Sequence, residues 1–142
     1  MKDTLKPGIE STFTFRIPVS KTVSALYPES AEFQAMPGVL ATGYLVGFLE
    51  WACVRAINPH LDWPAEQTVG THVDISHIAA TPVGFDVTAK VKLLEVDKRR
   101  LVFAVEANDG VELISKGTHE RFIINKEKFD AKMKEKAARG KT

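Results

Sequence analysis

A carboxylate in the middle of an otherwise apolar segment is the first feature of the sequence that could do chemistry. Residues 40–58 would form a helix with apolar residues on every face and Glu50 near its centre. An unpartnered buried charge is unstable, so Glu50 must be paired, protonated or open to a cavity. Arg55 lies about 140° further around such a helix, which makes pairing within the helix awkward. We predict a functional Glu50, with pairing to another buried donor as the structural alternative.

Thr42 and Gly43 begin the same helix. Thr is an ordinary helix N-cap, so a structural role is as well supported as a functional one. In the functional interpretation, free N–H groups of the first turn and the helix dipole stabilise an oxyanion. Thr42 and Glu50 are eight residues apart, about 12 Å along a regular helix and about 80° around it. They can act on one atom only if Thr42 precedes the regular helix or a second subunit completes the site.

His77 is the third candidate. In the predicted strand 66–80, alternation places His77 on the more apolar, helix-facing side. A lone histidine there is more often a core residue than a catalyst, but an imidazole that shares a core with Glu50 suits acid–base chemistry. Gly70 interrupts the same strand, which indicates a bulge or a point where another group approaches the backbone.

The other reactive side chains do not suggest metal or thiol chemistry. His72 and His77 would lie on opposite faces of a strand, and His60 and His119 look peripheral by their spacing, so no metal site is expected. Cys53, the single cysteine, lies mid-helix among apolar residues and is expected to be a small buried hydrophobe. No Walker loop or GxGxxG motif is present. Carboxylate and imidazole chemistry requires neither a metal nor a separate cofactor.

The remaining patterns predict the elements that must position these residues. A strand is expected at 12–19, then an irregular lid candidate at 21–38 and the helix at 40–58. Four consecutive strands are expected near 66–80, 85–93, 101–107 and 111–124, followed by a basic helix or tail at 126–142. Strands in a run with segregated helices indicate an α+β fold, in which one antiparallel sheet wraps the long helix.

Composition limits the kind of protein. With 142 residues, 44% hydrophobic and 26% charged, the chain suffices for one domain, 1–142, with its own core. The net charge of +1 provides no basic field for nucleic acid, although the tail alone has seven basic against three acidic residues. Glu50 argues against a membrane span, and the N-terminal residues lack an apolar signal region. One cysteine suits a reducing compartment, so we expect a cytoplasmic protein.

Motifs along nearly the whole chain resemble the fluoroacetyl-CoA thioesterase family. They are KTV at 21–23, LYPES at 26–30, ATG at 41–43, EWACVRA at 50–56, His77 with AATP at 79–82, DGV at 109–111 and GTHER at 117–121. The resemblance implies a hotdog fold and a homodimer with acyl-CoA sites near the subunit interface. It also implies a set of site residues: catalytic Thr42, Glu50 and His77, and substrate-binding Phe33, Met36, Gly43, Gly70 and Arg121.

One position departs from the family pattern. The fluoroacetyl-specific enzyme has a second aromatic lid residue where this chain has Met36, whose flexible side chain is less shape-specific than Phe. The resemblance therefore supports thioester hydrolysis more firmly than strict selection of a fluorinated acyl group.

The reaction implied by the resemblance is hydrolysis of a short-chain acyl-CoA, with CoA as part of the substrate. Glu50 would attack the thioester carbonyl or activate water, Thr42 and nearby N–H groups would stabilise the oxyanion, and His77 would move protons. The alternative is a hotdog module that binds acyl-CoA without cleaving it. A hotdog hydratase is a third possibility, which matches the Thr, Glu and His pattern less well.

Overall fold

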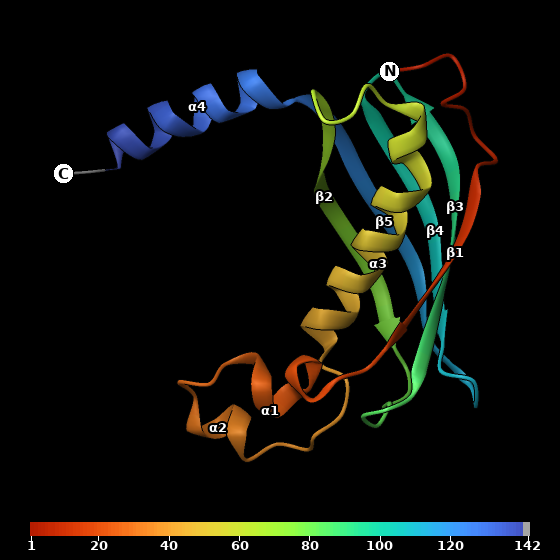
Figure 1. Cartoon of the computed structure of the whole chain (residues 1–142), viewed down its shortest axis with the longest axis vertical. Helices are drawn as coiled ribbons and strands as arrows, with labels where there is room; N and C mark the ends of the chain where they lie inside the picture. Colours follow the sequence, from red (N-terminus) through yellow and green to blue (C-terminus); the bar gives the residue numbers. More distant parts are fainter. Residues whose placement is uncertain (141–142) are drawn as a thin grey trace.

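Five antiparallel strands curve around one long helix in the computed structural model, which describes residues 1–140 (Figure 1). The strands are β1 (Glu10–Arg16), β2 (Glu66–His77), β3 (Asp86–Asp97), β4 (Arg100–Asn108) and β5 (Leu113–Asn125). The helices are η1 (Val19–Lys21), α1 (Val23–Leu26), α2 (Ala31–Gln34), α3 (Thr42–Ile57), η2 (Asn58–His60) and α4 (Lys126–Arg139). The sheet order β1-β3-β4-β5-β2 makes β1 and β2 the edge strands. The predicted α+β architecture is confirmed.

The core lies between one face of α3 and the concave face of the sheet. On α3 the buried residues follow helical spacing: Leu45, Phe48, Leu49, Ala52, Cys53, Ala56 and Ile57. On the strands they alternate, as in Val87, Ala89, Val91 and Leu93 of β3 and Leu101, Phe103 and Val105 of β4. The alternation predicted from the sequence therefore identifies the inward-facing side chains.

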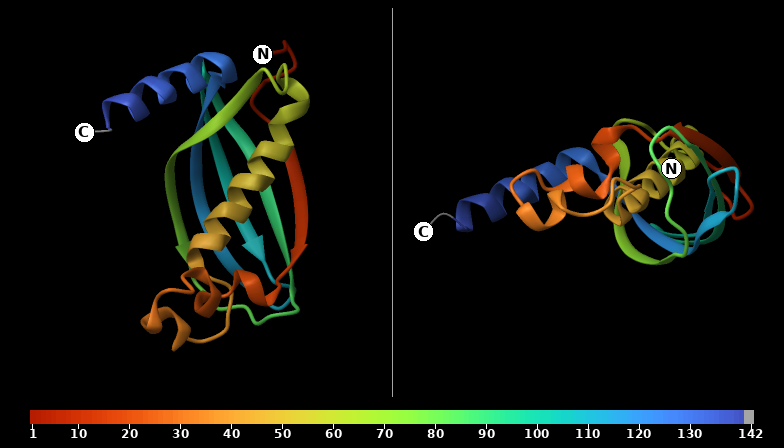
Figure 2. Two further views of the ribbon diagram at one scale, coloured as in Figure 1. Left: turned by 60° about the vertical axis from the view of Figure 1, so that its left-hand side comes forward. Right: turned by 90° about the horizontal axis from the view of Figure 1, so that it is seen from below.

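The sheet wraps α3 without covering it on every side within one chain. Gly43 and Gly47 are exposed along α3, and Trp51 is 47% exposed although its ring also packs against Phe13 of β1. Figure 2 shows why, because the sheet curves around the helix without closing over it. An apolar sequence pattern reports that a helix face avoids water but does not identify what covers it.

The segment 21–38 is more ordered than the sequence suggests. It contains the one-turn helices α1 and α2, and the Ser30 hydroxyl oxygen accepts a hydrogen bond from the Phe33 N–H at the start of α2. Helices of four residues are too short to produce a periodic pattern, which explains the missed assignment. The two helices lie at the N-terminal end of α3 (Figure 1). A Cβ atom added to Gly43 would lie 3.7 Å from a methyl carbon of Leu26, so α1 borders the start of α3.

The C-terminal helix α4 projects away from the sheet, beyond the end of β5 (Figure 2). Asn125 caps it, since its side-chain oxygen accepts a hydrogen bond from the Lys128 N–H at 3.0 Å. The last two residues of the predicted tail lie outside the described residues. None of the helices within 1–140 is long and apolar enough to cross a membrane.

Candidate active site

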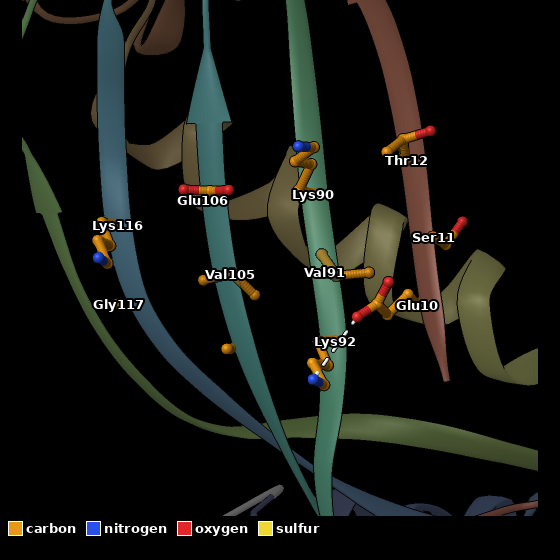
Figure 3. Close-up of a pocket in the computed structure, with 11 residues that line it drawn as sticks. Glu10, Ser11, Thr12, Lys90, Val91, Lys92, Val105, Glu106, Lys116 and Gly117 are labelled. Carbon is orange, nitrogen blue, oxygen red and sulfur yellow. Dashed lines mark ion pairs between the residues drawn. The ribbon is translucent and has the colours of Figure 1, made fainter. Parts of the chain in front are cut away.

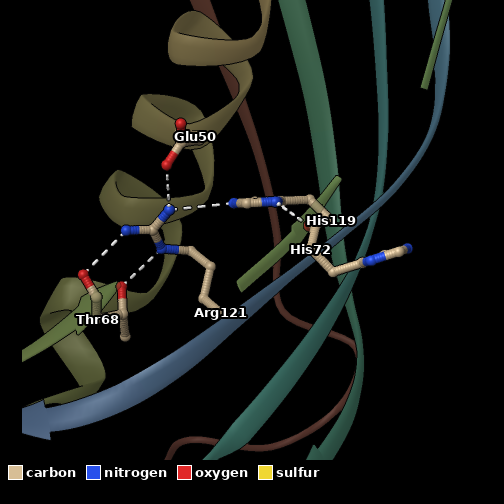
Figure 4. A network of polar contacts seen from close by, with 5 residues as sticks. All are labelled: Glu50, Thr68, His72, His119 and Arg121. Carbon is tan, nitrogen blue, oxygen red and sulfur yellow. Dashed lines mark hydrogen bonds and ion pairs between the residues drawn. The ribbon is translucent and has the colours of Figure 1, made fainter. Parts of the chain in front are cut away.

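Glu50 points from the middle of α3 towards β2 and β5, where it meets Arg121 (Figure 4). Nη1 of Arg121 donates a hydrogen bond to Oε2 of Glu50 at 2.9 Å. The Arg121 side chain is 6% exposed and that of Glu50 is 38% exposed. The structural alternative for Glu50, a donor other than Arg55, is therefore realised. The ion pair with Arg121 uses only one oxygen of the Glu50 carboxylate, and the other oxygen points away from the guanidinium (Figure 4).

Arg121 is itself held by two further residues. Its Nε donates to the Thr68 hydroxyl at 2.7 Å and its Nη2 to the Thr68 carbonyl at 2.9 Å. Nη1 also lies 3.1 Å from Nε2 of His119. A buried guanidinium is tolerated when its N–H groups are paired in this way. Arg121 is therefore a buried, hydrogen-bonded residue beside Glu50 and not an exposed surface cation.

His119 was expected to be peripheral, and this expectation is wrong. It is 1% exposed, and its Nδ1 lies 2.8 Å from the backbone carbonyl oxygen of His72. Burial lowers the pKa of His119, so the ring is neutral near pH 7. Strand alternation could have revealed the position, because His119 and Arg121 are two residues apart and therefore share a face of β5.

Gly70 is the point on β2 where Glu50 and the backbone meet. The pairing of β2 with β5 shifts register between Gly70 and His72, which confirms the predicted bulge. A Cβ atom at Gly70 would lie 2.8 Å from Oε2 of Glu50 and 3.3 Å from Nη1 of Arg121. Only glycine leaves room for the carboxylate at this distance, as the predicted close approach requires.

Thr42 and His77 form a second polar pair. Thr42 is the first residue of α3 and His77 the last of β2, and Oγ1 of Thr42 lies 2.8 Å from Nδ1 of His77. The N-cap position belongs to Ala41, so the capping interpretation of Thr42 is wrong. Burial lowers the pKa of His77, and its Nε2 is a buried atom with no hydrogen-bond partner within residues 1–140. A neutral imidazole beside a hydroxyl group can accept or relay a proton.

The N–H groups of the first turn of α3 lie beside this pair. The first backbone bond within α3 runs from the Leu45 N–H to the Ala41 carbonyl, so the N–H of Gly43 has no partner in the helix. Such groups favour negative charge. The remaining predicted residues belong to the segment with α1 and α2, at the same end of α3. Phe33 packs on Tyr27 with ring centroids 5.3 Å apart, and Met36 is 45% exposed.

The predicted site residues therefore form two groups. Thr42 and His77 lie at the start of α3, whereas Glu50 lies with Gly70 and Arg121 at its middle. Because Thr42 is inside the regular helix, eight residues still separate it from Glu50 by about 12 Å along the axis. Within one chain the two groups do not meet.

Two other features of the structure do not belong to either group. A cavity of about 630 Å³ occupies the outer face of the sheet, where Lys90, Glu106 and Lys116 line it and α3 lies behind the strands (Figure 3). Burial raises the pKa of Cys53 to about 12, so its thiol stays protonated and unreactive.

Residues 1–140 contain no group of three or more His, Cys, Asp or Glu side chains arranged to hold a metal ion.

Comparisons with known proteins agree with this architecture. A family model for the fluoroacetyl-CoA-specific thioesterases matches residues 22–127. A fluoroacetyl-CoA thioesterase of Streptantibioticus cattleyicolor is 49% identical over 140 residues, which span 99% of this chain and 100% of the relative. A solved structure of a fluoroacetyl-CoA thioesterase, 49% identical, superposes with a TM-score of 0.91 and covers 94% of this chain and 98% of its own.

A more distant structure supports the fold alone. It is a hot-dog-like protein from Thermanaerovibrio acidaminovorans, 20% identical, with a TM-score of 0.76 over 92% of this chain and 91% of its own. The hotdog fold expected from the sequence is therefore confirmed. On the strength of the family match and of near-complete coverage at 49% identity, the chain belongs to the fluoroacetyl-CoA-specific thioesterase family.

Proposed function

We propose that the protein hydrolyses short-chain acyl-CoA thioesters and that Glu50 is the central catalytic residue. The observation that carries this proposal is the state of the Glu50 carboxylate. One oxygen is held by Arg121 against Gly70, while the other is directed away from that pair. An oriented carboxylate with one oxygen available is suited to attack a carbonyl carbon or to take a proton from water.

Both routes produce the same products. As a nucleophile, the free oxygen of Glu50 adds to the thioester carbonyl, and collapse expels CoA thiolate and leaves an acyl–Glu50 anhydride that water hydrolyses. As a general base, Glu50 takes a proton from water as that water adds to the carbonyl, and the thiolate again leaves. In either route the carbonyl oxygen becomes an oxyanion. We propose that the Gly43 N–H and the Thr42 hydroxyl stabilise it while His77 moves a proton.

The separation of the two polar groups motivates a homodimer. We propose that Thr42 and His77 of one subunit act together with Glu50 of the partner subunit. Two features support this arrangement: β2 has no strand partner on its outer edge within residues 1–140, and the face of α3 that carries Gly47 is exposed. An unpaired strand beside an apolar helix face is the kind of surface that a second copy can cover.

Complementation between variants tests the shared site. Light scattering is expected to give twice the 15.7 kDa of one chain. Mixed and reassociated Thr42→Ala and Glu50→Gln chains should recover about a quarter of wild-type activity, because half of the dimers then carry one intact site. No recovery from demonstrated heterodimers, or a monomer at working concentration, would contradict the shared site.

An acyl-CoA panel tests the activity itself. Acetyl-, fluoroacetyl- and short branched acyl-CoA are expected to release free thiol, measured as steady-state turnover. Met36 is flexible and 45% exposed, so discrimination between acyl groups should be weaker than an aromatic lid residue would impose. Tight binding by calorimetry without thiol release over long incubation would instead support the non-catalytic acyl-CoA-binding module.

CoA enters this proposal only as part of the substrate. The proposed steps use a carboxylate, a hydroxyl, an imidazole and backbone N–H groups, and they need no further cofactor. We place the protein in the cytoplasm because its one cysteine, Cys53, is a buried free thiol, which suits a reducing compartment.

A further inference from the structure

We propose that His119 is a positioning residue for the reaction: it holds Arg121 so that the guanidinium fixes the Glu50 carboxylate in its working orientation. This inference rests on the proposed function of Glu50. His119 is the one buried imidazole of the network in Figure 4, and the steps assigned to Thr42, Glu50 and His77 do not use it.

The N–H groups of Arg121 are directed to three different residues. Nη1 carries two hydrogen atoms. One is directed to Oε2 of Glu50 at 2.9 Å and the other to Nε2 of His119 at 3.1 Å. Nε and Nη2 donate to Thr68 on the opposite edge of the group. Because a guanidinium is planar and rigid, Thr68 and His119 together determine the direction of the second N–H of Nη1, which meets Glu50.

The tautomer of His119 follows from its other nitrogen. Nδ1 faces the carbonyl oxygen of His72 at 2.8 Å, and a carbonyl can only accept, so Nδ1 carries the proton. In the neutral ring, Nε2 then has a lone pair that accepts from Arg121. A buried ring beside a guanidinium favours this neutral form. The hydrogen bond made by one ring nitrogen of a histidine commonly determines which of the two nitrogens carries the proton.

The bulge in β2 provides both the carbonyl group that orients His119 and the space that Glu50 occupies. The register shift between Gly70 and His72 presents the His72 carbonyl to His119. The same bulge contains Gly70, whose missing Cβ leaves room for Glu50. Its irregular backbone therefore orients the histidine and admits the carboxylate at one place, as bulges next to active sites do.

Two substitutions of His119 distinguish a role in positioning Arg121 from a role in filling core volume. In His119→Gln, the amide oxygen can reach the place of Nε2 and accept from Arg121, whereas His119→Leu fills a similar volume without an acceptor. We expect His119→Leu to lower kcat about 10- to 100-fold, since displacing a reacting group by about an ångström has effects of this size. KM should change about threefold or less, because the free oxygen of Glu50 acts mainly in the transition state. His119→Gln should recover most of kcat.

A double-mutant cycle provides the second test. If His119 acts through Arg121, then His119→Leu should have no further effect on kcat in an Arg121→Met background. Additive losses would overturn the proposal, as would equal losses in the Gln and Leu variants. Should Arg121→Met fail to fold, the Gln and Leu comparison decides alone.

The Glu50→Gln variant distinguishes failure of the positioning role of His119 from failure of the proposed function. Unchanged kcat in folded His119→Leu together with an inactive Glu50→Gln variant would overturn the positioning role and leave the proposed function standing. Full activity in Glu50→Gln would overturn the proposed function, and the positioning role with it.

Discussion

Glu50→Gln is expected to lower kcat for acyl-CoA hydrolysis about 10³-fold with little change in KM. Glutamine has nearly the same shape as glutamate, and its amide oxygen can still accept the hydrogen bond from Arg121 at the position of Oε2. The variant should therefore keep the fold and the arrangement of Arg121. An amide, however, has neither the negative charge of a nucleophile nor the basicity to take a proton from water.

Thiol release by purified wild-type and variant protein measures this effect, and thermal melting checks that the fold persists. Glu106→Gln is the matched control, because Glu106 lies on the outer face of the sheet between Lys90 and Lys116. It should retain wild-type turnover. A pre-steady-state burst of CoA in the wild type would identify the nucleophilic route. Turnover by Glu50→Gln within about twofold of wild type would remove Glu50 from the mechanism.

Gly70→Ala should reduce kcat about 100-fold while leaving the fold nearly intact, since misplacing a reacting group by an ångström has effects of this size. The new Cβ would lie 2.8 Å from Oε2 of Glu50, closer than nonbonded atoms approach. The carboxylate is the end of a flexible, 38% exposed side chain, so it can move aside. The consequence is loss of the bond to Arg121 rather than unfolding.

Activity and stability must both be measured for Gly70→Ala. Gly140→Ala is the control for a general effect of replacing glycine, since a Cβ there meets only ordinary contacts at 3.6 Å or more. The expected pattern is a large fall in kcat for Gly70→Ala with a melting temperature close to wild type. Unchanged kcat would show that the position of the carboxylate against β2 does not matter for turnover.

Several elements were predictable because local chemistry determines them. The alternation in 85–93 and 101–107 matches β3 and β4, and the apolar run around Glu50 matches α3. Gly70 was recognisable as a bulge or close approach because glycine weakens a strand interior and is favoured there mainly at such positions. The short helices α1 and α2 were missed since four residues provide no period to detect.

The sequence by itself determined the fold class, the family resemblance and the residue types of the chemistry. Only the tertiary structure decided which of these residues meet. Periodicity assigns a side chain to a face of its own element, but the pairing register and the bulge of β2 determine what that face encounters. For this reason Glu50 lies beside Arg121 rather than Thr42, and His119 is a buried partner of that pair instead of a surface residue.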